Sequence, residues 1–206
     1  MEKIHSRDIR NVCLLGHGAS GKTSLAEAML YIKKETDRLG KPSEGNTVCD
    51  YDAEEIKRGF TLSASIAPVF HNGVKINIID TPGYLDFQSE ALQALRVAGS
   101  ALIVVDGKAG VEVGTEIAWD LVCKDKMPRA FFINKCDDPE TRFRKVFQEM
   151  HEKFGARFVD DISVAEVNDY LTYLYYTEGR AYKYVESFLK MFYLVFGQAY
   201  SRNYLC

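Results

Sequence analysis

The segment that most constrains this chain is residues 16–23, which read GHGASGKT. The apolar residues 12–15 precede it, and residues 24–32 follow with a pattern that predicts a helix. A strand, a glycine-rich turn and a helix N-terminus in this order form a phosphate-binding loop, because backbone N–H groups then point at the phosphates. Gly16 and Gly21 allow backbone conformations that a Cβ would obstruct. The alternative is an ordinary glycine-rich turn with a surface lysine. It is disfavoured, because such a turn would have no reason to match the motif at every fixed position.

Two side chains of this segment have expected roles of their own. Lys22 is expected to reach the β- and γ-phosphates, and the hydroxyl of Thr23 is expected to bind Mg²⁺. The predicted nucleotide-binding residues of the segment are Gly16, His17, Gly18, Ala19, Ser20, Gly21, Lys22, Thr23 and Ser24.

Length and composition limit the possible partners and compartments. A chain of 206 residues fits one domain, or one domain and part of another. The net charge of −3 gives no sign of a broad nucleic-acid surface, so we expect no DNA and only local RNA contacts. The 5 cysteines show no paired spacing, which favours reduced thiols. No signal core or apolar run of membrane length occurs, so we expect a soluble cytoplasmic protein that contacts no membrane.

Residues 43–59 are polar and acidic, and alone they are typical of a solvated loop. Between a phosphate-binding loop and a strand, the same segment is where a nucleotide-sensing loop would lie. Thr61, just after it, is the candidate second hydroxyl ligand of Mg²⁺. The alternative for Thr61 is an ordinary strand threonine.

Residues 61–70 and 74–79 have the character of strands, and Asn72-Gly73 between them predicts a hairpin. The second strand leads into the sequence DTPG, at the end where an open α/β sheet places its chemistry. We expect Asp80 to hold Mg²⁺ through water and the N–H of Gly83 to sense the γ-phosphate. Alone this motif is weak, but its position after a hairpin and a phosphate-binding loop strengthens it.

Helical and strand-like segments alternate along the rest of the chain. Their predicted ranges are 89–97, 112–123 and 138–154 for helices, and 9–15, 101–105 and 130–133 for strands. Asp138 is expected to cap the last of these helices. Such alternation predicts an open, mainly parallel α/β sheet with helices on both faces.

The strand at 130–133 ends in Asn134-Lys135-Cys136-Asp137, which indicates the base. The Asp137 carboxylate can accept from N1–H and the exocyclic amine of guanine, whereas adenine would leave it unpaired. Asn134 is expected to tie this loop to the base and the phosphate-binding loop. The stem of Lys135 is expected to lie along the base plane.

These motifs together resemble the GTP-binding domain of the elongation factor G group of translational GTPases. Residues 58–62, RGFTL, are similar to the group's RGITI, and residues 110–119, GVEVGTEIAW, resemble its GVQxxTExxW. The second element separates this group from generic Ras-like GTPases. The resemblance covers roughly residues 8–155 and implies a P-loop GTPase (Ras-like) fold, GTP/GDP and Mg²⁺ as ligands, and the ribosome as partner.

The chain departs from the group's pattern at two positions of the expected site. Tyr84 stands where the group usually has a histidine that positions the attacking water, and a phenol cannot become a cation at neutral pH. We therefore expect slow hydrolysis, with Lys22, Thr61, Gly83 and Tyr84 as the catalytic residues. Ala19 replaces a frequent aspartate, which makes assistance by a monovalent cation doubtful.

The C-terminal part fits the resemblance less well. Residues 1–155 are predicted to form the GTP-binding domain, and residues 156–206 part of a subdomain inserted into it. In that interpretation residues 180–184 belong to the insert, and the sheet lacks its last strand and last base contact. The alternative places the last base contact at residues 163–165. The aromatic tail is expected to pack in a core or against missing domains rather than to stack RNA bases.

The sequence thus predicts a monomeric GTPase of the elongation factor G type that meets RNA only on the ribosome. One alternative is a GTP-dependent binding module that does not hydrolyse GTP, for which Tyr84 is the motive. A P-loop ATPase or kinase is the other, and residues 134–137 disfavour it.

Overall fold

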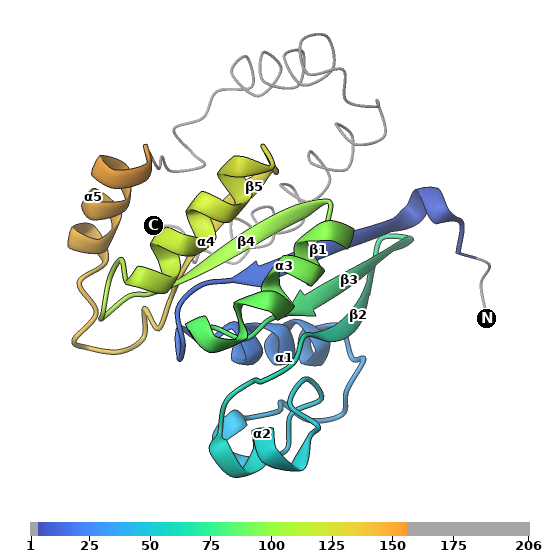
Figure 1. The fold of residues 1–206 in the computed structure, drawn as a ribbon. Helices are drawn as coiled ribbons and strands as arrows, with labels where there is room; N and C mark the ends of the chain where they lie inside the picture. Colours follow the sequence, from blue (N-terminus) through green and yellow to red (C-terminus); the bar gives the residue numbers. More distant parts are fainter. Residues whose placement is uncertain (1–3, 156–206) are drawn as a thin grey trace, which may run out of the picture. The chain divides into compact units, whose positions relative to one another are not determined.

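The computed structural model describes residues 4–155 of the chain, and in them a five-stranded sheet carries the expected site (Figure 1). The strands are β1 (Ile9–Leu15), β2 (Ser65–His71), β3 (Val74–Asp80), β4 (Ser100–Asp106) and β5 (Arg129–Asn134). The α-helices are α1 (Lys22–Ile32), α2 (Ala53–Arg58), α3 (Gln88–Val97), α4 (Val113–Lys124) and α5 (Phe143–Phe154). Three short 3₁₀ helices are η1 (Ser6–Asp8), η2 (Pro42–Glu44) and η3 (Leu85–Phe87).

The sheet has the strand order β2-β3-β1-β4-β5, in which only the β2–β3 pair is antiparallel. Helix α1 covers one face, and α3 and α4 cover the other (Figure 1). The prediction of an open, mainly parallel sheet with helices on both faces is confirmed. Because β1, β3, β4 and β5 run in the same direction, the residues that follow them gather at one edge of the sheet.

The core lies around β4, where all 7 residues are buried. The strand sits between β1 and β5 and is covered by helices, so it has no polar face. Residues 12–15 of β1 are also buried. Rigid central strands of this kind fix where the loops at their carboxyl ends begin.

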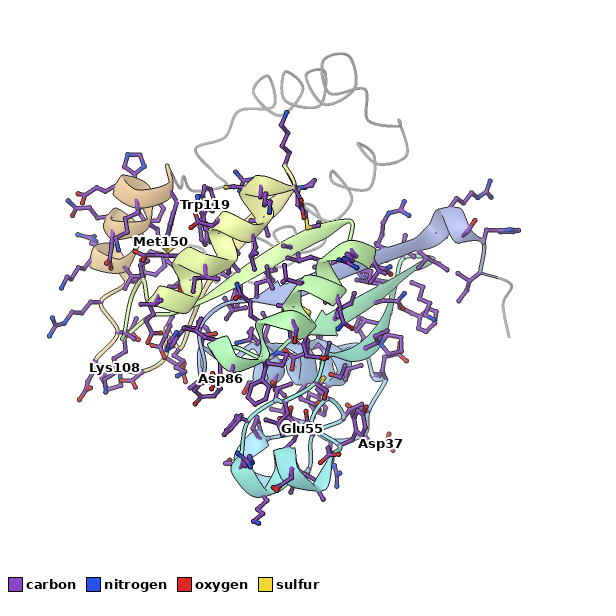
Figure 2. All side chains as sticks on the ribbon, in the orientation of Figure 1. Asp37, Glu55, Asp86, Lys108, Trp119 and Met150 are labelled. Atoms are coloured by element: carbon purple, nitrogen blue, oxygen red, sulfur yellow. The ribbon has the colours of Figure 1, made fainter. Side chains whose placement is uncertain are left out.

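The acidic segment 43–59, which alone is typical of a solvated loop, contains helix α2. Asp52 caps this helix in a capping box with Glu55, whose side chain accepts from the Asp52 N–H. The other Glu55 oxygen accepts from the N–H groups of Leu62 (2.9 Å) and Ser63 (3.1 Å). Figure 2 shows Glu55 between α2 and the rest of the domain, and its side chain is buried.

The predicted starts of one strand and one helix are wrong, because both elements begin several residues later. Strand β2 begins at Ser65 rather than at residue 61, because the preceding backbone N–H groups bond to Glu55 instead of a neighbouring strand. Helix α5 begins at Phe143 rather than at Asp138. Asp138 instead closes a turn, accepting from the N–H groups of Glu140 and Thr141. The predicted hairpin is confirmed, with Asn72 and Gly73 at φ of 48° and 77°.

The predictions for residues 156–206 lie outside the described residues, and so does the second part of the predicted domain division. Within residues 4–155, no helix has the length and apolar character needed to cross a membrane.

Candidate nucleotide-binding site

The phosphate-binding loop (residues 16–23) connects β1 to α1, and two of its glycines are required by their surroundings. Gly16 has φ of 137°, and a Cβ there would strike the carbonyl oxygen of Val104 in β4. Gly21 has φ of 96° at the N-cap of α1, where a Cβ would strike the Asn134 side-chain amide. Both close approaches bring neighbouring strand ends onto the loop, so larger residues do not fit. Ser24 lies exposed on the first turn of α1.

The ammonium group of Lys22 lies inside the phosphate-binding loop. Its Nζ donates to the carbonyl oxygens of Gly16 (3.1 Å) and His17 (2.8 Å). Burial lowers the pKa of Lys22 to about 8, although the nearby Asp80 carboxylate opposes that change. A Cβ added to Gly83 would meet Lys22 Nζ and the Gly18 nitrogen, so the chain after β3 passes directly beside the loop. A buried cation beside a helix N-terminus suits a polyphosphate.

Two hydroxyls and two carboxylates converge beside the loop. Thr23 Oγ1 donates to Asp80 Oδ2 at 2.6 Å and lies 3.0 Å from Thr61 Oγ1. Thr61 Oγ1 in turn donates to Asp50 Oδ1 at 2.7 Å. All four side chains are buried. The three predicted metal-binding residues, Thr23, Thr61 and Asp80, therefore lie together, although Thr61 is 38 residues from Thr23.

The second oxygen of Asp80 suggests what this cluster accommodates. Asp80 Oδ1 is buried and has no hydrogen-bond partner, and burial raises the pKa of Asp80 to about 7. Burial also raises the pKa of Asp50. No group of three or more His, Cys, Asp or Glu side chains among the described residues forms a metal site. Hydroxyl and carboxylate oxygens are nevertheless the hard ligands that Mg²⁺ takes, with waters and phosphate oxygens completing its shell.

The segment after β5 reaches the phosphate-binding loop from the other side. Asn134 Nδ2 donates to the Ser20 carbonyl oxygen at 2.9 Å. Lys135 Nζ donates to the Ala19 carbonyl oxygen at 2.8 Å and to Asp106 Oδ2 at 2.6 Å. Asp137, the expected base reader, is exposed in the same segment. The predicted base-binding and phosphate-binding residues are thus joined by hydrogen bonds.

Tyr84 lies over the phosphate-binding loop rather than in solvent alone. A Cβ on Gly18 would approach the Tyr84 ring to 3.0 Å. The same ring packs against Phe60 with a centroid distance of 4.7 Å. Tyr84 therefore connects the segment before Thr61 with the segment after Gly83, next to the place where the γ-phosphate is expected.

His17 links the phosphate-binding loop to the start of α4, which belongs to the element at residues 110–119. Its Nδ1 accepts from the Gly114 N–H at 3.2 Å, and its Nε2 lies 3.5 Å from Glu112 Oε1. The His17 side chain thus holds the start of α4 against the loop, and its nucleotide contact stays a prediction.

Sequence reasoning missed four buried acids around the site: Glu27, Asp50, Glu55 and Asp106. Glu27 of α1 accepts from the N–H groups of Val48 (2.7 Å) and Cys49 (3.0 Å). The burial of Asp50 and Glu55 corrects the interpretation of their segment as solvated. A readable signal existed only for Glu55, in the capping spacing from Asp52.

Comparison with known proteins agrees with this arrangement. The family model of the elongation factor Tu GTP-binding domain matches residues 7–202. Ribosome-releasing factor 2, mitochondrial, of Drosophila grimshawi is 41% identical over 157 residues, which cover 76% of this chain and 21% of that protein. The protein of the same name from Drosophila ananassae is 38% identical over 177 residues, covering 82% and 24%. The chain spans about a quarter of the length of these curated relatives.

Solved structures show the same fold. A crystal structure of a protein from Thermus thermophilus is 36% identical with a TM-score of 0.69, covering 73% of this chain and 23% of that one. Elongation factor SelB of Methanococcus maripaludis, in complex with the GTP analogue GppNHp, is 21% identical with a TM-score of 0.53 and covers 70% and 26%. The SelB likeness shows the fold alone. The family model and the relatives confirm the resemblance stated above: this chain belongs to the elongation factor Tu GTP-binding domain family, within the translational GTPases.

Proposed function

We propose that this chain binds GTP with Mg²⁺ and hydrolyses it to GDP and phosphate, as the GTP-binding domain of an elongation factor G-type translation factor. The observation that carries the proposal is the buried group of Thr23, Thr61 and Asp80 beside Lys22. Its partner-less Asp80 oxygen and its two hydroxyls fit a hydrated divalent cation on a triphosphate.

Each predicted residue has a place in this proposal. Lys22 and the backbone N–H groups of the phosphate-binding loop hold the β- and γ-phosphates. Thr23 and Thr61 bind the metal through their hydroxyls, and Asp80 binds it through water. When bound, Mg²⁺ neutralises the charge that develops on the phosphate oxygens. Asn134, Lys135 and Asp137 hold the guanine.

In this proposal, GTP hydrolysis changes the conformation of two segments of the chain. Thr61 ends the segment that contains α2, and Gly83 begins the segment that leads into α3. Both contact the phosphate-binding loop or its metal-binding hydroxyl. Loss of the γ-phosphate removes a ligand from both segments at once, which frees them to move.

The ribosome is the proposed partner, because the relatives carry the name ribosome-releasing factor 2. We propose a monomer that meets RNA only on the ribosome, without membrane or DNA contacts. The relatives are named mitochondrial, so an organelle is an alternative to the cytoplasmic location predicted from the sequence.

A second candidate function is GTP-dependent binding without hydrolysis, and Tyr84 is the observation that favours it. The phenol packs on Phe60 over Gly18, next to the proposed γ-phosphate position. It offers a hydrogen bond to water but no cationic acid at neutral pH.

Single-turnover phosphate release from GTP, with and without ribosomes, separates the two candidates. The enzyme releases phosphate faster with ribosomes, and Thr61→Ala abolishes the stimulation. Ser63→Ala is the matched control, because Ser63 lies two residues away and is exposed. GTP binding without any phosphate release would establish the binding module instead. Tighter binding of ATP than of GTP would contradict both.

A further inference from the structure

Asp106, the last residue of β4, belongs to none of the motifs described above. Both oxygens of its carboxylate nevertheless accept hydrogen bonds. Oδ1 accepts from the backbone N–H groups of Lys108 (2.8 Å) and Ala109 (3.1 Å), and Oδ2 accepts from Lys135 Nζ at 2.6 Å. The residue is 9% exposed. One carboxylate therefore closes the turn after β4 and holds a side chain from the segment after β5.

The charge of Asp106 is maintained by these contacts. Burial alone would raise its pKa, but the hydrogen bonds from Lys135 and from the turn N–H groups hold the pKa of Asp106 below its usual range. The carboxylate therefore stays ionised at neutral pH. An ionised acceptor makes a stronger hydrogen bond to an ammonium than a neutral one.

Lys135 is constrained at both its backbone and its side chain. Its φ of 58° lies in the left-handed region, which non-glycine residues seldom adopt. Its carbonyl oxygen accepts from Thr141 Oγ1 at 2.5 Å, and its Nζ also donates to the Ala19 carbonyl oxygen at 2.8 Å. The ammonium thus joins the end of β4, the phosphate-binding loop and the base-reading segment.

An ordinary surface ion pair would contribute little, because solvent competes for both partners. The pair between Lys108, in the turn after β4, and Glu140, in the turn after β5, is of this kind, with side chains 54% and 65% exposed; Figure 2 shows Lys108 at the outer edge of the domain. The Asp106 side chain is only 12% exposed, whereas that of Lys135 is 41% exposed. The buried Asp106 carboxylate is therefore the rigid partner, and it restrains the more exposed Lys135 side chain.

We propose that Asp106 is a positioning residue for guanine nucleotides, which fixes the Lys135 side chain along the base and against the phosphate-binding loop without touching the nucleotide itself. The inference rests on the proposed function, because it deepens the role of the same site. Since the base site lies far from the γ-phosphate end, losing this support weakens GDP and GTP equally. It leaves the hydrolysis rate of bound GTP unchanged.

The test measures the equilibrium affinity of the whole chain for fluorescent GDP and GTP, together with single-turnover hydrolysis. Asp106→Asn keeps an oxygen for the turn but faces Lys135 without charge. We expect it to weaken both nucleotides by the same factor, roughly tenfold, the size of one charge-assisted hydrogen bond. Glu140→Gln, which breaks the exposed pair with Lys108, is the matched control and leaves both affinities unchanged.

A double-mutant cycle distinguishes positioning from general damage to the fold. Lys135→Met keeps the apolar stem and removes the ammonium, so adding Asp106→Asn to it is expected to cost nothing further. A full additional loss in that background would overturn the inference, as would unequal effects on GDP and GTP. If the Asp106→Asn variant does not fold, Lys135→Met is tested alone, and it must weaken GDP and GTP by the same factor. Wild-type affinity of the Lys135→Met variant overturns the inference.

The wild-type chain separates this inference from the proposed function. A wild-type chain that binds GTP while Asp106→Asn matches it overturns the inference alone. A wild-type chain that binds no guanine nucleotide overturns both.

Discussion

The ring of Tyr84 lies against Gly18, so close that a Cβ at Gly18 would stand 3.0 Å from the ring atoms Cε1 and Cζ. This contact, together with the packing of Tyr84 on Phe60, sets an aromatic side chain over the phosphate-binding loop. Tyr84 is 42% exposed, so it covers the loop without being buried in the core. Tyr84 is therefore a candidate to influence the attacking water at the proposed γ-phosphate position.

Replacing Tyr84 with histidine is expected to accelerate ribosome-stimulated GTP hydrolysis at least about tenfold, because an imidazole can carry charge near neutral pH. Tyr84→Phe is the control, since it keeps the ring packing and removes the hydroxyl. Single-turnover phosphate release on ribosomes measures the effect. An unchanged rate in Tyr84→His would mean that this position packs a turn and takes no part in hydrolysis.

Asp50 supports the hydroxyl of Thr61, so Asp50→Ala is expected to affect GTP and not GDP. Without its acceptor, the Thr61 hydroxyl is free to turn away from the metal, and hydrolysis should slow by about tenfold. GDP affinity is expected to stay at the wild-type value, because the Thr61 segment is proposed to respond to the γ-phosphate. Asp37→Ala makes the same charge change at an exposed site and is the control. Equal weakening of GDP by Asp50→Ala would contradict this role.

Glu27 fixes the beginning of the acidic segment to α1. Glu27→Ala would leave the N–H groups of Val48 and Cys49 without their acceptor. The Cys49 N–H is buried and the Val48 N–H is partly buried. An unpaired buried donor costs about 1–3 kcal/mol, so the free energy of unfolding is expected to fall by about 2 kcal/mol or more. Urea denaturation measures the difference. The exposed Glu44→Ala serves as the comparison, with no measurable change expected, and an equally small effect at Glu27 would show that water replaces its carboxylate.

Asp80 makes the stability of the protein without nucleotide and metal depend on pH. Its pKa is raised to about 7, so the folded protein favours the protonated carboxyl, and stability is lost as pH rises from about 4 to 7. Lys22 has a pKa lowered to about 8, so its contribution to stability changes only above this pH range. Asp80→Asn should therefore gain in Tm over the wild type between pH 5 and 7. If the Tm values of Asp80→Asn and of the wild type, measured in EDTA, change with pH in parallel, this role of Asp80 is contradicted.

The motifs at strand ends could be predicted from the sequence because their spacing and apolar flanks are local. Asp80 ends β3 and Asn134 ends β5, and parallel strands bring such ends together. Asp50 and Asp106 could not be predicted in the same way. Their burial depends on donors such as Thr61 and Lys135, which arrive from elsewhere in the chain, and acidic residues in polar segments otherwise indicate solvent.

Helix α2 illustrates an error that the sequence could have avoided. Asp52 and Glu55 have the spacing of a capping box, yet the acidic composition around them favoured a loop. The late start of α5 is different in kind. Asp138 is an acceptable cap, but it closes a turn that bonds the Thr141 hydroxyl to the Lys135 carbonyl oxygen. The Arg142 N–H then donates to the Gly107 carbonyl oxygen, and this tertiary contact delays the helix.

The central claim is that a guanine nucleotide occupies the site, and the choice of base by Asp137 tests it most directly. Competition binding should show that the wild-type chain prefers GTP over ATP by about a hundredfold or more, because an adenine leaves the carboxylate unpaired. Asp137→Asn should lose that preference and bind xanthosine triphosphate better, since an amide can donate to the 2-oxo group of xanthine. A GTP preference that survives Asp137→Asn unchanged would contradict the account.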